Sequence, residues 1–424
     1  MSELIRRLLR SNYWNAVAKL AGATGVAQLI GFVTSLFVAR LYTPEMTGVL
    51  GVVLAIVGIV SPLAALRYEM AIPLVREEKD ARYLLRICIA MAVFVAIAST
   101  FYILLLLLRP DFAPADDLGS YVWFLPVLIL GNGILNCLRF WCNRAADFAL
   151  LSRIRIGSAV GTGLTVVPFA WILGGDSTWL FVGQIVSLSI GIFLVVSHFG
   201  LWRPSLKFEK IGGLSLLREY RQFPFYNAPL TLLDQSAALS PALLLAAYYS
   251  TATTGQFNLA MLIVRVPSAL IGAAVAQVFY SRAAGLRDQP QALSRLVITT
   301  TVLLVAIAVP MIFTIWFFGV DLFLLIFNRQ WQQAGEFSTI LVWPAALALI
   351  LSPTSMLPSL LNLQHRQLMV VGSSSLLRVV VLWIACFSVN VHEALFWFAI
   401  TESIGRLVYA GWIAHEMRSR RIPC

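Results

Sequence analysis

The stretch LLRICIAMAVFVAIASTFYILLLLL, from Leu84 to Leu108, decides the fold class of this chain. About 20 mostly apolar residues are enough for a helix to cross the hydrocarbon core of a bilayer, and this stretch is longer than that. It therefore predicts a membrane-spanning helix. Comparable segments recur on both sides and predict twelve such helices, at residues 16 to 41, 48 to 72, 84 to 108, 121 to 141, 155 to 174, 179 to 200, 224 to 249, 254 to 280, 296 to 319, 338 to 361, 369 to 389 and 394 to 414.

The composition of the chain supports the same class. Of its 424 residues, 59% are hydrophobic and 12% are charged, whereas soluble proteins have roughly 45 to 50% and about 25%. Twelve helices of about 20 residues use roughly 240 positions and leave only short tails and loops. The sequence thus predicts an all-α integral membrane protein. It disfavours an enzyme whose catalytic domain sits on a membrane anchor, and it leaves a channel, a transporter or an intramembrane enzyme.

Positive charges predict the orientation of the helices, because Lys and Arg beside helix ends stay cytoplasmic. With the N-terminus inside, the inner segments hold 22 such residues and the outer segments hold three, Arg40, Arg109 and Arg329. Both termini are therefore expected in the cytoplasm. The basic opening MSELIRRLLR precedes an apolar stretch without a small-residue cleavage site, which predicts a first spanning helix that the mature protein keeps.

The longest inner loop, Leu201 to Phe223, is basic and divides the apolar segments into two groups of six. We predict an N-terminal six-helix bundle over residues 1–200, a cytoplasmic basic linker over 201–223 and a C-terminal six-helix bundle over 224–424. Parallel repeats of this kind are a recurrent design of transporters.

An internal duplication is expected to relate the two bundles. Moving the second half back by 207 positions superposes identical residues at the same helix-turn-helix corner: Ala246, Tyr249, Thr254 and Gly255 on Ala39, Tyr42, Thr47 and Gly48. The same shift brings Pro267 within two residues of Pro62, in the second helix of each half.

Charged residues inside the predicted helices are the candidates for function. On insertion scales an Arg, Lys or Asp at a helix centre costs roughly 2.5 to 3.5 kcal/mol, so such residues are expected to face one another or water. Five lie near the middle of a segment: Asp234, Arg265, Arg378, Glu402 and Arg406. Four lie nearer the cytoplasmic side: Lys19, Arg67, Glu69 and Arg139.

Two interpretations of these charges stay open. They could simply hold helices together, and Glu402 and Arg406 favour this, because an acid four residues before a base lies on the same helical face. Alternatively, the positive surplus attracts an anion, since Asp234 can neutralise only one of Arg265 and Arg378, and guanidinium groups suit phosphate. The predicted substrate-binding set is Arg265, Arg378, Arg406, Lys19, Arg67 and Arg139. The predicted coupling or charge-balancing set is Asp234, Glu402 and Glu69.

Prolines suggest where a helix bends, because each one removes a backbone donor. Pro224, Pro229 and Pro241 flank the buried charge of the seventh segment and are predicted to form a hinge. The sequence shows no nucleophile constellation, no metal-type spacing of its five cysteines and no phosphate-cradling glycine loop. We therefore expect no catalytic residues, no metal and no cofactor. The net charge of +11 is spread through short loops and gives no surface for nucleic acid.

Four stretches carry a resemblance to a known family. ARLYTPEMTG (Ala39 to Gly48) and RYEMAIPLV (Arg67 to Val75), followed by REEKDARYLL, resemble the N-terminal signature of polysaccharide-unit flippases. These are the Wzx-type branch of the multidrug, oligosaccharidyl-lipid and polysaccharide exporter superfamily. GQFNLAMLIVRVPSALIGAAVAQVFYSRAA (Gly255 to Ala284) and FNRQWQQAGEFSTIL (Phe327 to Leu341) resemble the same family in the second half. The similarity covers most of the chain.

The resemblance implies a V-shaped pair of six-helix bundles around a central cavity that opens alternately to each side of the membrane. It implies a multi-pass protein of the bacterial inner membrane that carries undecaprenyl-pyrophosphate-linked oligosaccharide units to the periplasmic leaflet, for O-antigen, capsule or exopolysaccharide. Membrane lipids, a polysaccharide polymerase and a chain-length regulator are the other expected partners. Arg265 occupies a matching motif position, and a pyrophosphate head group agrees with the cationic surplus.

Other functions stay open at this point. A multidrug exporter of the related branch would favour acids in its cavity when the drug is cationic. A peptidoglycan-precursor flippase also carries an anion, although such proteins often have fourteen helices. A membrane polysaccharide polymerase usually needs a large periplasmic loop, and the longest outer loop here runs only from Val320 to Ser338. A scaffold subunit would have no reason to keep charges within the membrane.

Overall fold

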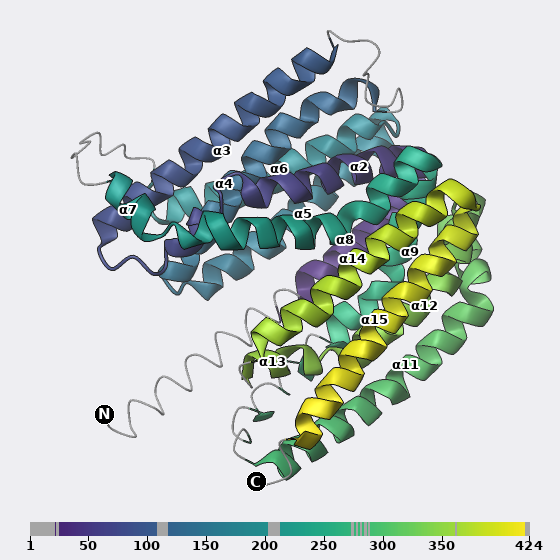
Figure 1. Ribbon diagram of the computed structural model, residues 1–424. Coiled ribbons are helices and arrows are strands. Elements are labelled where there is room, and N and C mark those ends of the chain that lie inside the picture. Colours follow the sequence, from purple (N-terminus) through teal and green to yellow (C-terminus); the bar gives the residue numbers. More distant parts are fainter. Residues whose placement is uncertain are drawn as a thin grey trace. The chain divides into compact units, whose positions relative to one another are not determined.

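The computed structural model describes residues 22, 25–107, 118–201, 213–272, 275–276, 279, 282–283, 286, 289–360 and 363–419. Within these ranges every regular element is helical (Figure 1). Ten helices in the described ranges are long and apolar enough to cross a membrane. The predicted class, an all-helical membrane protein, is confirmed, and ten spans stand against the twelve that the sequence predicts.

The chain divides into two compact units. Unit 1 comprises Met1–Tyr42 and Val49–Leu239, and unit 2 comprises Thr43–Gly48 and Ser240–Cys424. The division falls inside a helix of the seventh apolar segment, after Leu239, so the two ends of that helix pack in different units.

Unit 1 is built mainly from helices of the first half of the chain. They are a helix over Gly25–Leu41, most of α2 (Pro44–Val60), α3 (Glu78–Leu107), α4 (Phe124–Arg144), α5 (Phe148–Leu173), α6 (Ser177–His198), the short α7 (Gly213–Glu219) and the first part of α8 (Ala228–Tyr248). Buried residues of α3, α4, α5 and α6 form its main core, among them Leu84, Cys88, Leu138, Ile154 and Val195. The outer face of α3 is apolar and exposed, as a lipid-facing helix requires.

Unit 2 is organised around α12 (Gln332–Leu351), which packs against α9 (Thr251–Pro267), α11 (Pro290–Phe327) and α15 (Val391–Ser419). The remaining long helix, α14 (Gln364–Ser388), packs along α15 (Figure 1). The four cysteines in the described ranges, Cys88, Cys137, Cys142 and Cys386, are buried and free. They act as apolar packing residues of the two units.

The second predicted helix, over 48 to 72, ends earlier than the hydropathy indicates. α2 stops at Val60, a 3₁₀ turn over Ser61–Leu63 contains Pro62, and Leu66 and Arg67 adopt left-handed backbone conformations with φ of 48° and 64°. Each left-handed residue other than glycine costs roughly 1 to 2 kcal/mol, so surrounding packing must hold this break in place. Apolar composition gave no sign of the break.

Two glycines allow the first turns of α2 and α9 to touch. A Cβ added to Gly48 would lie 2.6 Å from the carbonyl carbon of Thr251, and a Cβ added to Gly255 would lie 2.8 Å from that of Pro44. The contact is reciprocal, because the shift of 207 positions that pairs Gly48 with Gly255 also pairs Pro44 with Thr251. Helix backbones approach this closely only where small residues face each other.

Arg144, the last residue of α4, forms hydrogen bonds with the segment Ile72–Arg76, which leads into α3. Its guanidinium donates hydrogen bonds to the backbone carbonyls of Ile72 at 3.0 Å and of Arg76 at 3.1 Å, and also to that of Val75. Replacing it by leucine is expected to lower the free energy of unfolding by about 2 kcal/mol or more, because three charge-assisted bonds are lost together.

Thermal unfolding of the purified protein measures this effect. The control is Arg153→Leu, which removes an exposed arginine from α5. Equal melting temperatures for the two variants would show that Arg144 does not stabilise the connection.

Candidate functional site

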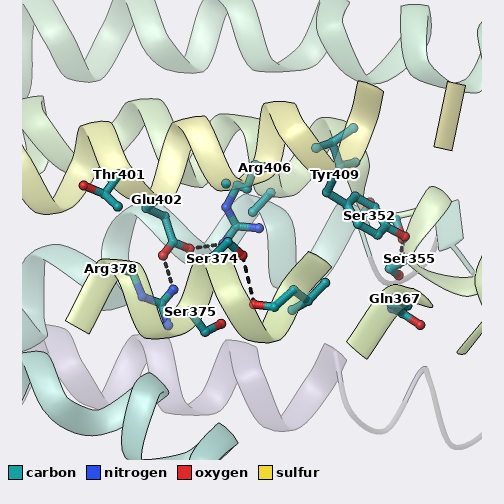
Figure 2. A pocket seen from close by; sticks show the side chains of 14 residues that line it. Ser352, Ser355, Gln367, Ser374, Ser375, Arg378, Thr401, Glu402, Arg406 and Tyr409 are labelled. Atoms are coloured by element: carbon teal, nitrogen blue, oxygen red, sulfur yellow. Dashed lines mark hydrogen bonds and ion pairs between the residues drawn. The ribbon is translucent and has the colours of Figure 1, made fainter. Parts of the chain in front are cut away.

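A bridged ion triad lies between α14 and α15 in unit 2. Arg378 of α14 donates from Nη1 to Oε2 of Glu402, and Arg406 donates from Nη2 to Oε1 of the same carboxylate at 2.5 Å (Figure 2). The Glu402 side chain is 8% exposed, whereas Arg378 is 17% and Arg406 33% exposed. One carboxylate thus bridges two guanidinium groups, and the triad keeps one positive charge in surplus.

The triad is built by helix periodicity and by close packing. Glu402 and Arg406 are one turn apart on α15, so they share a face, as the sequence predicts. Arg378 reaches the same carboxylate from α14 because Gly405 lets the helices approach: a Cβ at Gly405 would lie 3.0 Å from the Cβ of Ser374. The ion pair between helices depends on this tertiary contact.

The three residues of the triad line a cavity of about 410 Å³. Residues of α12, of the turn that follows it, of α14 and of α15 line the cavity. Apart from the triad and Tyr409, its polar lining residues are Ser352, Ser355, Gln367, Ser374, Ser375 and Thr401. Figure 2 shows Arg378 and Glu402 at one end and Ser352, Ser355 and Gln367 at the other.

Most of these hydroxyl groups already donate their proton to a helix carbonyl. Ser352 donates to Leu349, Ser355 to Ser352, Ser374 to Val371 and Thr401 to Trp397, at 2.7 to 2.9 Å. A hydroxyl that donates in this way keeps lone pairs that can accept a bond. The cavity therefore offers acceptors along its walls and cationic donors at one end.

The predicted site residues fall into two groups. The structure brings Arg378, Glu402 and Arg406 together in the triad. Arg265 of α9 is exposed and is not among the cavity-lining residues, although it is close enough to interact with the charges of Glu402, Arg406 and Arg378. Within unit 2, Glu402 is a carboxylate that pairs with Arg378.

The other predicted residues belong to unit 1. Arg67 donates to Glu69 at 3.3 Å, and Asn136 of α4 donates to the same carboxylate oxygen at 3.1 Å. Glu69 is completely buried, and the pair lies within the break after α2. Arg139 lies exposed on α4, next to the charge of Arg155. Lys19 lies outside the described residues.

The prolines and Asp234 lie along the seventh apolar segment. Pro224 falls in a π-helical turn over Phe223–Asn227, Pro229 in the first turn of α8 and Pro241 in its interior. Asp234 is exposed on α8 and accepts a hydrogen bond from Gln235 at 3.4 Å. The π turn shows local distortion at Pro224, and the hinge role of the three prolines stays a prediction.

Reasoning from charge alone missed the hydroxyl-rich wall of the cavity. Three successive serines, Ser373 to Ser375, precede Arg378 on α14, and such a run inside an apolar helix is a signal for a polar lining. Gln367 and Thr401 had no comparable local signal. Asn136 was also missed, because its partner Glu69 lies 67 positions away in the sequence.

Comparisons with known proteins agree with this architecture. A family model described as "Polysaccharide biosynthesis protein" matches residues 37–336, which is more than half of the chain. No curated protein matches the sequence.

Three solved structures have a similar fold. The inward-facing conformation of a multidrug resistance MATE family transporter of the MOP superfamily matches with a TM-score of 0.66 at 13% identity, over 93% of this chain and 95% of that one. A MATE transporter of Vibrio cholerae matches with 0.56 at 13%, over 97% and 98%. A MOP superfamily transporter of Pyrococcus furiosus, whose reversed pocket polarity is said to suggest a different function, matches with 0.60 at 12%, over 97% of both chains.

At identities this low, the structural matches establish the fold alone. The family follows from the match of the family model to the sequence. The chain is a multi-pass integral membrane protein with the fold of the MOP-superfamily transporters, and it belongs to the polysaccharide biosynthesis protein family.

Proposed function

We propose that the protein is a transporter and not an enzyme, and that it flips undecaprenyl-pyrophosphate-linked oligosaccharide units from the cytoplasmic to the periplasmic leaflet by alternating access. Family membership supports the link to polysaccharide synthesis. The observation that carries the choice of substrate is the cavity of unit 2, where a positively charged triad stands beside a wall of hydroxyl groups.

The cavity matches the two polar parts of such a substrate. Diphosphate oxygens accept charge-assisted hydrogen bonds, which Arg378 and Arg406 can donate in a planar fork. Sugar hydroxyls need acceptors, which the serine and threonine oxygens of the wall supply. Unpaired polar groups cost several kcal/mol each within a bilayer, so a cavity that bonds them lowers the barrier to their passage. The polyprenyl chain can stay in the lipid.

The proposed topology has twelve spans. Two further helices bring the ten candidate spans to twelve. They are the helix Gly25–Leu41 and α15, whose hydropathy is lowered by charges such as Glu402 and Arg406. The reciprocal contact of Gly48 and Gly255 supports two duplicated six-helix bundles, over 1–200 and 224–424, with 201–223 as a cytoplasmic linker. A V-shaped arrangement in the bacterial inner membrane, with both termini cytoplasmic, completes this proposal.

In this orientation the cavity of unit 2 runs from mid-membrane toward the cytoplasm. α14 begins on the cytoplasmic side, so Gln367 lies near that surface and Arg378 lies near the middle. A substrate would therefore enter from the inner leaflet and place its diphosphate at the deep end. Outward movement of each negative charge across about 100 mV, inside negative, is favourable by roughly 2.3 kcal/mol, so the membrane potential assists export.

The charge of the cavity argues against a multidrug exporter for cationic drugs. Such a cavity would need an acidic surplus, whereas the triad has one positive charge in excess. The Pyrococcus furiosus transporter, with its reversed pocket polarity, is a precedent within this fold for a pocket whose charge points to another function.

Deletion of the gene tests the proposed function. We expect surface polysaccharide to disappear while lipid-linked units accumulate, because synthesis continues but transfer stops. In spheroplasts of the deletion strain, a glycan-cleaving enzyme added outside should cleave few of these units. After lysis, the same enzyme should cleave most of them. Expression of the wild-type protein should restore outside access. Unchanged outside access in the deletion strain would refute the flippase, and a change confined to polymer length would indicate a polymerase.

A further inference from the structure

The Glu402 carboxylate accepts hydrogen bonds from two guanidinium groups, and a phosphoryl group can accept the same bonds. Its two carboxylate oxygens accept from guanidinium groups on two different helices, Arg378 on α14 and Arg406 on α15. Carboxylate and phosphoryl oxygens are both recognised by arginine in this forked geometry. We propose that Glu402 occupies, in the unloaded protein, the position that a phosphoryl group of the substrate takes in the loaded one, so that the two anions exchange.

The exchange can take place because the triad lines the cavity wall. Arg378, Glu402 and Arg406 all border the cavity, and the two guanidinium groups are more exposed than the carboxylate between them (Figure 2). An incoming anion can therefore approach the guanidinium groups from the cavity side.

Charge favours a diphosphate over the carboxylate as the partner of the two arginines. Glu402 supplies one negative charge against two positive charges, and Arg265 adds its field to the same group. A diphosphate carries more than one negative charge and has several oxygens that accept in the plane of a guanidinium group. It would thus neutralise the surplus that Glu402 leaves.

Glu402 also gives the transporter a way to release its substrate. Two guanidinium groups without an anion are costly away from water, so a protein without Glu402 would hold its diphosphate tightly. When Glu402 returns to the pair, the unloaded state regains its ion bonds and the anion can leave. Glu402 is thus a positioning residue, which sets the affinity of the two arginines for the substrate diphosphate.

This inference rests on the proposed function, and binding measurements on the purified full-length protein test it. The probes are undecaprenyl diphosphate and inorganic pyrophosphate, titrated by calorimetry, with undecaprenol as the uncharged control. We expect Glu402→Gln to bind both diphosphate probes at least about tenfold more tightly than the wild type, because a competing ion pair is removed. Transport in cells is expected to fall, because release becomes slow.

Two further variants keep the outcome interpretable. Glu416→Gln is the matched control, since Glu416 also lies on α15 and pairs with an arginine of α14, Arg366 at 2.5 Å, but does not line the cavity. Its affinity should stay at the wild-type value. If Glu402→Gln does not fold, Glu402→Asp serves instead, because the shorter side chain cannot bridge both arginines well, and a gain of several-fold is expected.

The outcomes separate the inference from the proposed function. Wild-type binding of undecaprenyl diphosphate with no gain in the Glu402 variants would overturn the exchange and leave the flippase standing. If the Glu402 variants bind undecaprenyl diphosphate more tightly but inorganic pyrophosphate no more tightly, the effect belongs to the lipid chain. That result would also overturn the exchange. No binding of undecaprenyl diphosphate by any variant would refute both.

Discussion

Replacing Arg378 by methionine is expected to reduce transport of the lipid-linked glycan by about 30-fold or more while leaving the protein in the membrane. The substitution takes one positive charge from the triad, so Glu402 and Arg406 remain as a neutral pair with no surplus for an anion. Losing a charge-assisted contact to a phosphoryl group away from water costs roughly 2 to 5 kcal/mol, which corresponds to a factor of about 30 or more. Methionine keeps much of the apolar stem of arginine and thus much of its packing.

The measurement is the amount of lipid-linked unit in the outer leaflet, divided by the amount of transporter in the membrane fraction. Arg366→Met is the control, because Arg366 also lies on α14 and pairs with a glutamate of α15, and it lies outside the cavity lining. That variant should transport at nearly the wild-type rate. Wild-type transport by Arg378→Met would remove the triad from the binding site.

Replacing Gly48 or Gly255 by alanine is expected to prevent accumulation of folded protein. The new methyl group would lie 2.6 Å from the carbonyl carbon of Thr251 in the first case and 2.8 Å from that of Pro44 in the second. Overpacked side chains cost about 1 to 3 kcal/mol when neighbours can move to other rotamers. Here the neighbour is helix backbone, so the helices themselves must separate and the cost is higher.

Gly411→Ala provides a matched control for both glycine variants. Gly411 lies within α15, and an added Cβ would meet nothing within 4 Å. Alanine is favoured over glycine inside a helix by about 1 kcal/mol, so this variant should be at least as stable as the wild type. Size-exclusion profiles and thermal unfolding in detergent distinguish the three proteins. Wild-type stability in Gly48→Ala and Gly255→Ala would show that the backbones of α2 and α9 do not touch.

Hydropathy determined the membrane helices because the bilayer imposes the same length and composition on each of them. The helices over Glu78–Leu107 and Ser177–His198 lie close to the predicted segments for this reason. Local spacing also determined the Glu402–Arg406 pair, since residues four apart meet on any helix. The family could be recognised because its motifs are contiguous in the sequence.

Tertiary structure alone decided which partners meet from different helices. Arg378 joins Glu402 because α14 and α15 pack closely at Gly405, and the serines near it become a cavity wall through the same packing. Glu69, in the break after α2, likewise meets Asn136 of α4, which lies 67 positions away in the sequence. Hydrophobicity and charge along a sequence determine which segments leave water and enter the bilayer. The partner of each polar side chain depends instead on how helices that are distant in the sequence pack together.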